Sequence, residues 1–270
     1  MHNEQLVIMF VGGPNQREDY HIEEGEELFY QLKGDMCVKI IENGKHRDVH
    51  IKEGEFFVLP GRIPHSPQRT AGSIGLVIER KRLENEKDGV RWFVPNSTDV
   101  LYEKWFNCKD LGVELIPLIK NYFASEEFKT KIPGNNVLDK SEYPFELNNV
   151  VLDLEKHGPY KFDDKIKSDS SKILNLTPDE LSLQFEILVL KTGEHVLEDY
   201  LRNNLDVWLW QLSGTSQLSL KCLNNNSEEK IDLNLNDSVL VEHKNFSNMR
   251  INVQNDSQLL LITQNPNKKV

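Results

Sequence analysis

Two short frames of the sequence carry residues of types that bind metals. In the first, His21 stands six residues before Glu27, and Gly34 follows seven residues after that carboxylate. In the second, Pro60 is followed five residues later by His65. Two histidines and one carboxylate, with coordination positions left open, are the ligand set of non-haem Fe(II) oxygenases. We therefore expect His21, Glu27 and His65 to hold one metal ion together.

The spacing of both frames resembles the two metal motifs of the cupin superfamily, a small β-barrel that holds a metal ion in its mouth. The chain departs from that pattern at two positions: Glu23 replaces a second histidine, and Arg69 replaces an asparagine. Arginine is suited to binding a carboxylate through two parallel hydrogen bonds. A metal with open positions beside an arginine predicts an acidic small-molecule substrate.

Longer runs of the chain resemble the 3-hydroxyanthranilate 3,4-dioxygenase family. The match covers most of the chain and is looser in its second half. The resemblance also implies further residues before Met1. The runs that carry it are MFVGGPNQREDYHIEEGEE (9–27), FYQL (29–32), PHSPQR (64–69), GLVIER (75–80), EKWF (103–106), CKDLG (108–112) and DVWLWQL (206–212).

This family opens the aromatic ring of 3-hydroxyanthranilate with O2, giving 2-amino-3-carboxymuconate semialdehyde. The reaction belongs to tryptophan catabolism, in the kynurenine pathway towards quinolinate and NAD. The resemblance implies an extradiol-type dioxygenase in which His21, Glu27 and His65 bind Fe(2+). The expected partners are a small aromatic acid and O2.

The resemblance also places four side chains at the substrate: Arg17, Glu27, Arg69 and Glu79. Arg69 and Arg17 are expected to hold the substrate carboxylate and so fix the orientation of the ring. Arg17 is also expected to have a catalytic role beside the O2 position. Glu79 is expected to act as the general base that takes up the proton lost on binding.

Other interpretations of these residues remain open. Arg17 and Arg69 could be surface cations, and Glu79 could be the solvent-side residue of an edge strand. A storage or sensing cupin would have the ligands without a convergent arginine and glutamate. A zinc cupin isomerase acting on sugar phosphates would keep more ligands, and a purely structural protein would show neither metal nor turnover.

Several polar residues carry a simpler expectation. The acidic run at 23–27 is expected to be a solvated turn, with Glu27 as the exception. Isolated histidines such as His50 are expected to be solvated or locally hydrogen-bonded. Cys37 and the tryptophans are expected to belong to the core.

Composition excludes some classes of partner. A net charge of −11 over 270 residues argues against nucleic acid, whose binding needs a basic surface. No apolar run reaches membrane-spanning length, and no signal peptide precedes the first predicted strand. Three isolated cysteines predict neither disulfides nor the second, cysteine-bound iron of bacterial family members. We therefore expect a cytoplasmic monomer with a single metal.

The first half of the chain reads as strands. Met36, Val38 and Ile40 alternate with other residues before the Asn43–Gly44 turn, a pattern typical of a β-hairpin. Helical periodicity appears only around residues 115–123. The expected fold is all-β: a bicupin of two small β-barrels (double-stranded β-helices) with a few short helices.

The second half repeats the first. Residues 29–34 align with residues 209–214 at an offset of 180, and a slightly larger offset aligns the strand after Gly54. The alignment sets Leu201, Val207 and Ser247 opposite the three predicted ligands. We therefore expect a catalytic cupin domain at 1–133, a linker at 134–150, and a degenerate cupin domain without metal at 151–270.

Overall fold

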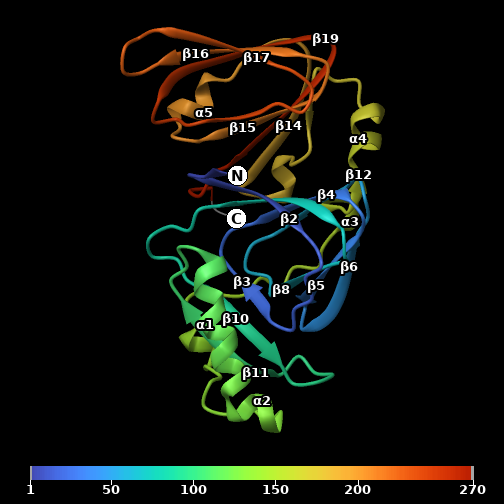
Figure 1. Cartoon of the computed structure of the whole chain (residues 1–270), viewed down its shortest axis with the longest axis vertical. Helices are drawn as coiled ribbons and strands as arrows, with labels where there is room; N and C mark the ends of the chain where they lie inside the picture. Colours follow the sequence, from blue (N-terminus) through green and yellow to red (C-terminus); the bar gives the residue numbers. More distant parts are fainter. Residues whose placement is uncertain (1, 269–270) are drawn as a thin grey trace. The chain divides into compact units, whose positions relative to one another are not determined.

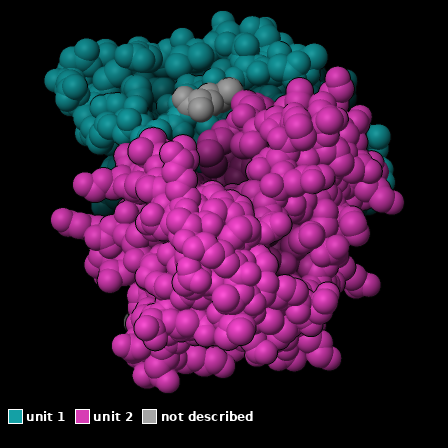
Figure 2. Space-filling model, turned by 60° about the horizontal axis from the view of Figure 1, so that its bottom comes forward, with its two compact units in different colours: residues 1–8, 162–270 teal, residues 9–161 magenta. Residues whose placement is uncertain are grey.

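The computed structural model describes residues 2–268, and the chain separates into two compact units (Figures 1 and 2). Unit 2 comprises residues 9–161, and unit 1 combines residues 1–8 with residues 162–270. Both units consist mainly of strands with short helices, which confirms the predicted all-β class. No described helix combines the length and the apolar composition that crossing a bilayer requires. The predicted division at 134–150 stays a prediction.

Unit 2 contains two sheets around a shared core. In the first, the strand order is β2 (Leu6–Gly12), β9 (Ile74–Arg80), β4 (Glu27–Lys33), β7 (Glu55–Leu59) and β12 (Tyr160–Lys161). The first residues of β2 and the strand paired with them, β1 (His2–Asn3), are counted with unit 1. In the second, the order is β11 (Val100–Phe106), β10 (Asp88–Phe93), β3 (Tyr20–Ile22), β8 (His65–Arg69), β5 (Met36–Glu42) and β6 (Lys45–Ile51). One apolar cluster includes Phe29 and Phe57 of the first sheet with Val38 and Ile40 of the second. The two sheets therefore face each other across this shared core.

The β5–β6 hairpin forms where the sequence predicted it. Asn43 and Gly44 both have positive φ angles, 46° and 73°, as a tight hairpin turn requires. Along β5, Met36, Val38 and Ile40 are buried in the core. Cys37 lies on the opposite face and is only half-buried, so the expectation that it belongs to the core was wrong. Alternation along a strand assigns each face.

One helical segment covers the end of the second sheet. Helix α1 (Leu111–Ala124) begins at Asp110, whose side chain accepts a hydrogen bond from the backbone of Gly112. Its buried face includes Tyr122, which stacks on Trp92 of β10 with ring centroids 4.1 Å apart. The predicted helix is confirmed. The other helical segments of unit 2 are α2 (Glu126–Thr130), η1 (Lys140–Glu142) and α3 (Leu154–His157).

Unit 1 is built around a second sheet system. Its strand order is β13 (Ile173–Asn175), β14 (Phe185–Val196), β19 (Phe246–Gln264), β15 (Val207–Ser213) and β18 (Ser238–Val241). A hairpin of β16 (Ser216–Cys222) and β17 (Glu228–Leu233) also pairs with β19. The helical segments are α4 (Phe162–Ser168), η2 (Asp179–Leu181) and α5 (Glu198–Arg202).

The repeat is visible in the strand bounds, because β15 and β16 lie 180 residues after β4 and β5. The buried amides of Gln31 and Gln211 make the same bond, each donating to the carbonyl two residues later. One predicted correspondence was wrong. Ile40 pairs with His65 and Leu220 pairs with Met249, so Met249 rather than Ser247 matches His65.

The predicted counterpart of His21 in unit 1, Leu201, was also wrong. His21 lies opposite His65, whereas the backbone N–H of Leu197 donates to the carbonyl of Met249, so Leu197 rather than Leu201 takes the place of His21. The alignment failed here because a helix, α5, lies between Leu197 and β15, where unit 2 has a short loop.

Candidate metal centre

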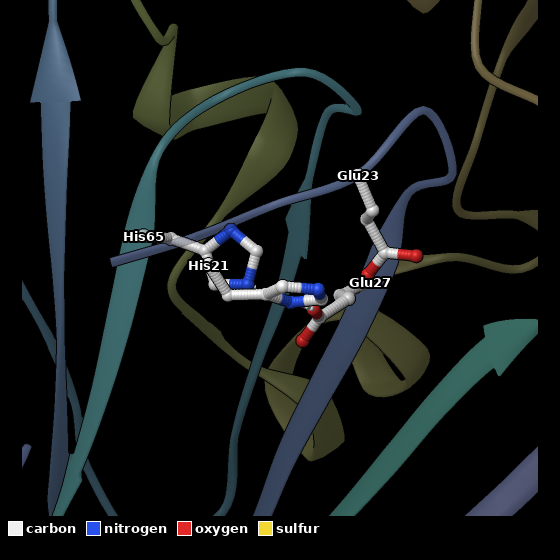
Figure 3. Close-up of side chains that lie close together, drawn as sticks. All are labelled: His21, Glu23, Glu27 and His65. Carbon is white, nitrogen blue, oxygen red and sulfur yellow. Dashed lines mark ion pairs between the residues drawn. The ribbon is translucent and has the colours of Figure 1, made fainter. Parts of the chain in front are cut away.

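Three strands bring the predicted ligands together. His21 lies in the middle of β3, His65 begins β8, and the two are direct cross-strand neighbours with ring centroids 5.3 Å apart. Glu27 begins β4 of the opposite sheet, and its Oε1 lies 2.8 Å from Nε2 of His65 and 3.8 Å from Nδ1 of His21. All three are buried, and their side chains converge (Figure 3).

The remaining ring nitrogens fix the orientation of both histidines. Nε2 of His21 donates to Oδ2 of Asp88 at 2.6 Å, and Nδ1 of His65 donates to the carbonyl of Ile63 at 2.9 Å. In the neutral rings, Nδ1 of His21 and Nε2 of His65 then carry the lone pairs that face Glu27. Metal-binding histidines typically have such a partner on the second nitrogen. Two lone pairs directed at one carboxylate suit a cation between them.

The pKa shifts of His21 and Glu27 favour a positive charge between these two side chains. Burial lowers the pKa of His21, but the hydrogen bonds to Asp88 and Glu27 outweigh burial and raise that pKa to about 9. Burial opposes ionisation of Glu27, yet the charge of His65 and hydrogen bonds from both histidines hold its pKa well below the usual range. A metal that binds here therefore replaces protons, and binding should release them.

Glu23 belongs to the same cluster. Ligand atoms of His21, Glu23, Glu27 and His65 all lie within 4.8 Å of one another. Glu23 and Glu26 are buried, so the expectation of a solvated acidic turn was wrong. Burial, followed by the charges of Glu79 and Glu27, raises the pKa of Glu23 well above its usual range despite the opposing charge of Arg82. Its position, where the cupin pattern has a histidine, was the sequence signal.

Arg82 connects this cluster to two further carboxylates. Its guanidinium donates to Glu79 Oε1 at 2.7 Å and to Asp88 Oδ2 at 2.9 Å, and it pairs with Glu23 Oε2 at 2.9 Å. Asp88 in turn binds His21. Arg82 and Asp88 carried no recognisable motif, and sequence analysis missed both. The pairing of β10 with β3, in which Val90 lies opposite His21, brings Asp88 close to His21.

Glu79 is buried near the end of β9. It is therefore not the solvent-side residue of an edge strand, which was one interpretation of the sequence. Leu28 pairs with Ile78, so Glu79 falls beside Glu27 in the next antiparallel pair. Its Oε1 accepts a hydrogen bond from Arg82, and no hydrogen bond to its Oε2 is present among the described residues. The carboxylate therefore lies next to a predicted ligand with one oxygen held in place.

Arg69 is also buried, at the end of β8. It lies four residues after His65, so both side chains leave the same face of the strand. Its Nε donates no hydrogen bond to any of the described residues. Burial and the charge of Arg17 lower the pKa of Arg69, whereas Glu27 opposes that shift. A buried guanidinium with an unused N–H group can donate a charge-assisted hydrogen bond to a bound anion.

Arg17 lies in the loop before β3, where its guanidinium pairs with Asp19 and its backbone exchanges hydrogen bonds with Gln68. Arg17 and Arg69 line one cavity of about 700 Å³. His21, Glu27 and His65 are not among the described residues that line it. The structure thus brings the two arginines together, while their role at the substrate stays a prediction.

Known proteins resemble this chain over most of its length. A family model described as 3-hydroxyanthranilic acid dioxygenase matches residues 1–123. The 3-hydroxyanthranilate 3,4-dioxygenase of Xenopus laevis is 47% identical over 246 residues, 89% of this chain and 82% of the relative. The human enzyme of that name is 46% identical over 245 residues, 89% and 80% of the two chains. This chain belongs to the 3-hydroxyanthranilate 3,4-dioxygenase family.

The family match confirms the resemblance stated from the sequence. The matched segment, residues 1–123, contains each of the site residues described above. The 3-hydroxyanthranilate 3,4-dioxygenase of Danio rerio is 49% identical over 216 residues, 79% of this chain and 72% of the relative. Among solved structures, a variant of Bacillus subtilis oxalate decarboxylase is similar, with a TM-score of 0.48, 16% identity, and coverage of 92% of this chain and 65% of that one.

Proposed function

We propose that this chain catalyses the reaction for which its family is named, the opening of 3-hydroxyanthranilate by O2. The observation that carries the proposal is the convergence of two histidines and a carboxylate from opposite sheets, in a chain of this family. The ring bond between the hydroxyl-bearing carbon and its unsubstituted neighbour breaks. Both atoms of O2 enter the product, 2-amino-3-carboxymuconate semialdehyde: one in the new carboxylate and one in the aldehyde. Its place is the kynurenine pathway of tryptophan catabolism.

Fe(II) is the proposed metal, one per chain, held by His21, Glu27 and His65. The donor set supports it, because two imidazole nitrogens and one carboxylate oxygen without sulfur are typical ligands of non-haem Fe(II). When bound, Fe(II) supplies open coordination positions and one-electron chemistry that no side chain here offers. Asp88 orients His21 through its second nitrogen.

Arg69 and Arg17 have the proposed task of binding the substrate carboxylate. The buried Nε of Arg69 has an unused donor, and a guanidinium can present two parallel N–H groups to a carboxylate. Fixing the carboxylate fixes the ring, so that the bond to be broken has one orientation. The ion pair with Asp19 holds Arg17 in the same cavity.

Glu79 has the proposed task of accepting the proton of the ring hydroxyl. Arg82 holds its Oε1, so Oε2 is the atom that takes the proton. Glu27 lies beside it in the sheet and would contact the same end of the substrate. A positioned carboxylate that moves one proton is general base catalysis.

The wider proposal is a monomer of the cytoplasm. Three free cysteines support a reducing compartment. We also propose that residues 1–133 form the catalytic cupin domain and that residues 151–270, beyond a linker at 134–150, serve structure. In support, both groups of potential metal-binding side chains among residues 2–268 lie in unit 2.

Anaerobic loading tests the function. Protein loaded with Fe(II) is mixed with 3-hydroxyanthranilate without oxygen and then exposed to air. We expect a new absorbing product and uptake of one O2 per substrate consumed. Full iron content without oxygen uptake would contradict the proposal. His21→Ala is the control, because it should retain the fold and lose both iron and turnover.

A further inference from the structure

A second group of potential ligands lies on the outer face of the β5–β6 hairpin. Cys37 and His50 are direct cross-strand neighbours, and Asp48 is on the same face, two residues before His50. The ligand atoms of these three residues all lie within 4.8 Å of one another. Neighbouring cross-strand side chains are close enough to share a ligand. This face is opposite to the one that contributes Val38 and Ile40 to the core.

We propose that Cys37, Asp48 and His50 form a second metal site that binds Zn²⁺. Thiolate, imidazole and carboxylate are the three ligand types of zinc sites, and three protein ligands leave the fourth position to water. A thiolate favours a soft metal, whereas the sulfur-free group at His21, Glu27 and His65 suits Fe(II). The two sites of unit 2 therefore differ in the metal they select.

The surroundings of the three side chains support a bound cation. Among the described residues, no hydrogen bond or ion pair is made by the side chain of any of the three, although their backbones are paired in the β-ladder. All three line the cavity of about 700 Å³; Cys37 is half-buried and Asp48 and His50 are exposed, so the group is accessible to ions. The charged or titratable groups that line this cavity with Cys37 are Arg17, Glu18, Asp35, Lys39, Asp48, His50 and Arg69.

The thiol itself is held in its protonated form. Burial, followed by the charge of Asp48, raises the pKa of Cys37 to about 11, although Lys39 opposes the shift. Zn²⁺ reverses this balance because a coordinated thiol loses its proton. Binding thus forms one Zn–S bond and releases one proton to solvent.

Co²⁺ is the probe for this site, because a thiolate bound to Co²⁺ gives a charge-transfer band in the near ultraviolet. Co²⁺ is added to the whole chain after anaerobic Fe(II) loading. We expect the band to saturate at one Co²⁺ per chain and to disappear when Zn²⁺ is added. The Fe(II) group contains no cysteine, so Co²⁺ bound there cannot give this signal.

Variants decide between this site and other thiols. Cys37→Ser should abolish the band, and His50→Gln should weaken Co²⁺ binding by more than about tenfold, the effect of losing even a supporting residue. Cys222→Ser is the matched control, since Cys222 is also half-buried beside a carboxylate, Glu229. It should keep the band.

His21→Ala should also keep the band, which separates this proposal from that of the Fe(II) site. Binding of Co²⁺ without a thiolate band, or a band that survives Cys37→Ser, would overturn the second site. Circular dichroism of Cys37→Ser establishes that a lost band reflects a lost ligand and not unfolding.

Discussion

The two units place different residues at matching positions of the same strand framework. Strand register sets Leu197, Val207 and Met249 of unit 1 where unit 2 has His21, Glu27 and His65. All three unit 1 residues belong to one buried apolar cluster. The strand framework therefore does not require polar side chains at these three positions. Among the residues that the structure describes, the group formed by His21, Glu27 and His65 is a feature of unit 2 alone.

The difference extends to the proposed substrate residues. Ile78 pairs with Leu28 and Ile262 pairs with Trp208, so Thr263 matches Glu79. Met36 pairs with Arg69 and Ser216 pairs with Val253, so Val253 matches Arg69. Burying a large apolar side chain contributes about 1.5–3 kcal/mol, whereas burying a charge is costly unless it is paired. Unit 1 thus gains stability at the positions where unit 2 places its reactive groups.

Removing one histidine should have the largest effect on this contrast. His65→Ala is expected to abolish metal retention and turnover, because it removes one of three ligands while the fold persists. Metal content and kcat are measured on protein checked by circular dichroism. Its counterpart Met249→Leu should cost less than about 1.5 kcal/mol of unfolding free energy and leave metal content unchanged. Full activity of His65→Ala would refute the ligand assignment.

The next largest effect is expected from Glu79, the proposed general base. Glu79→Gln keeps the shape of the side chain but cannot accept the proton, so kcat should fall about 10²–10⁴-fold with metal content unchanged. Thr263→Val, the matching change in unit 1, should leave kcat as it is. Normal turnover by Glu79→Gln would reduce Glu79 to a hydrogen-bonding role, and normal turnover by Glu79→Ala as well would remove it from the reaction.

Arg82→Met should affect metal affinity and stability together. It leaves Glu23, Glu79 and Asp88 buried without their common cation, which should lower the unfolding free energy by roughly 3–5 kcal/mol. Loss of the Asp88 contact that supports His21 should weaken metal binding about 10–100-fold. Urea unfolding and metal titration measure the two effects.

Arg91→Met is the matched control for Arg82→Met. Arg91 forms a buried pair with Glu103, and its side chain leaves the face of β10 opposite to that of Asp88. Arg91→Met should therefore lower the unfolding free energy and leave metal affinity unchanged. Equal metal affinity in the two variants would show that Arg82 supports the fold and not the site.

The smallest effect is expected at the substrate carboxylate. Arg69→Lys keeps the charge but loses the planar pair of donors, so KM should rise about tenfold or more, the scale of a hydrogen bond to a charged group. Steady-state kinetics measures this rise. A substrate analogue without the carboxylate should bind the wild type and the variant equally well. A wild-type preference for the carboxylate in the variant would exclude Arg69 as its anchor.

The sequence predicted residues whose spacing is local or whose turn chemistry is distinctive. His21, Glu27 and His65 were found by their spacing along the sequence to glycine and proline residues of the two motifs. The Asn43–Gly44 hairpin was found because these two residue types favour the backbone angles of a tight turn. Arg82 and Asp88 could not be found in this way, because their roles depend on β10 pairing with β3 at long range. The counterpart Leu197 was missed because an extra helix, α5, shifts the alignment. Met249 was missed because the segment from Val241 to Met249 is two residues longer than the matching segment from Leu59 to His65.

The position of Glu27 opposite the two histidines has a mechanical consequence. His21 and His65 belong to one sheet of unit 2 and Glu27 to the other, so a metal ion bound by all three would cross-link the sheets. A ligand that binds only the closed form stabilises it by mass action, and local opening is where that stabilisation is visible. Backbone amides of β3, β4 and β8 should therefore exchange hydrogen more slowly in metal-loaded protein, whereas those of β15 and β16 should not change.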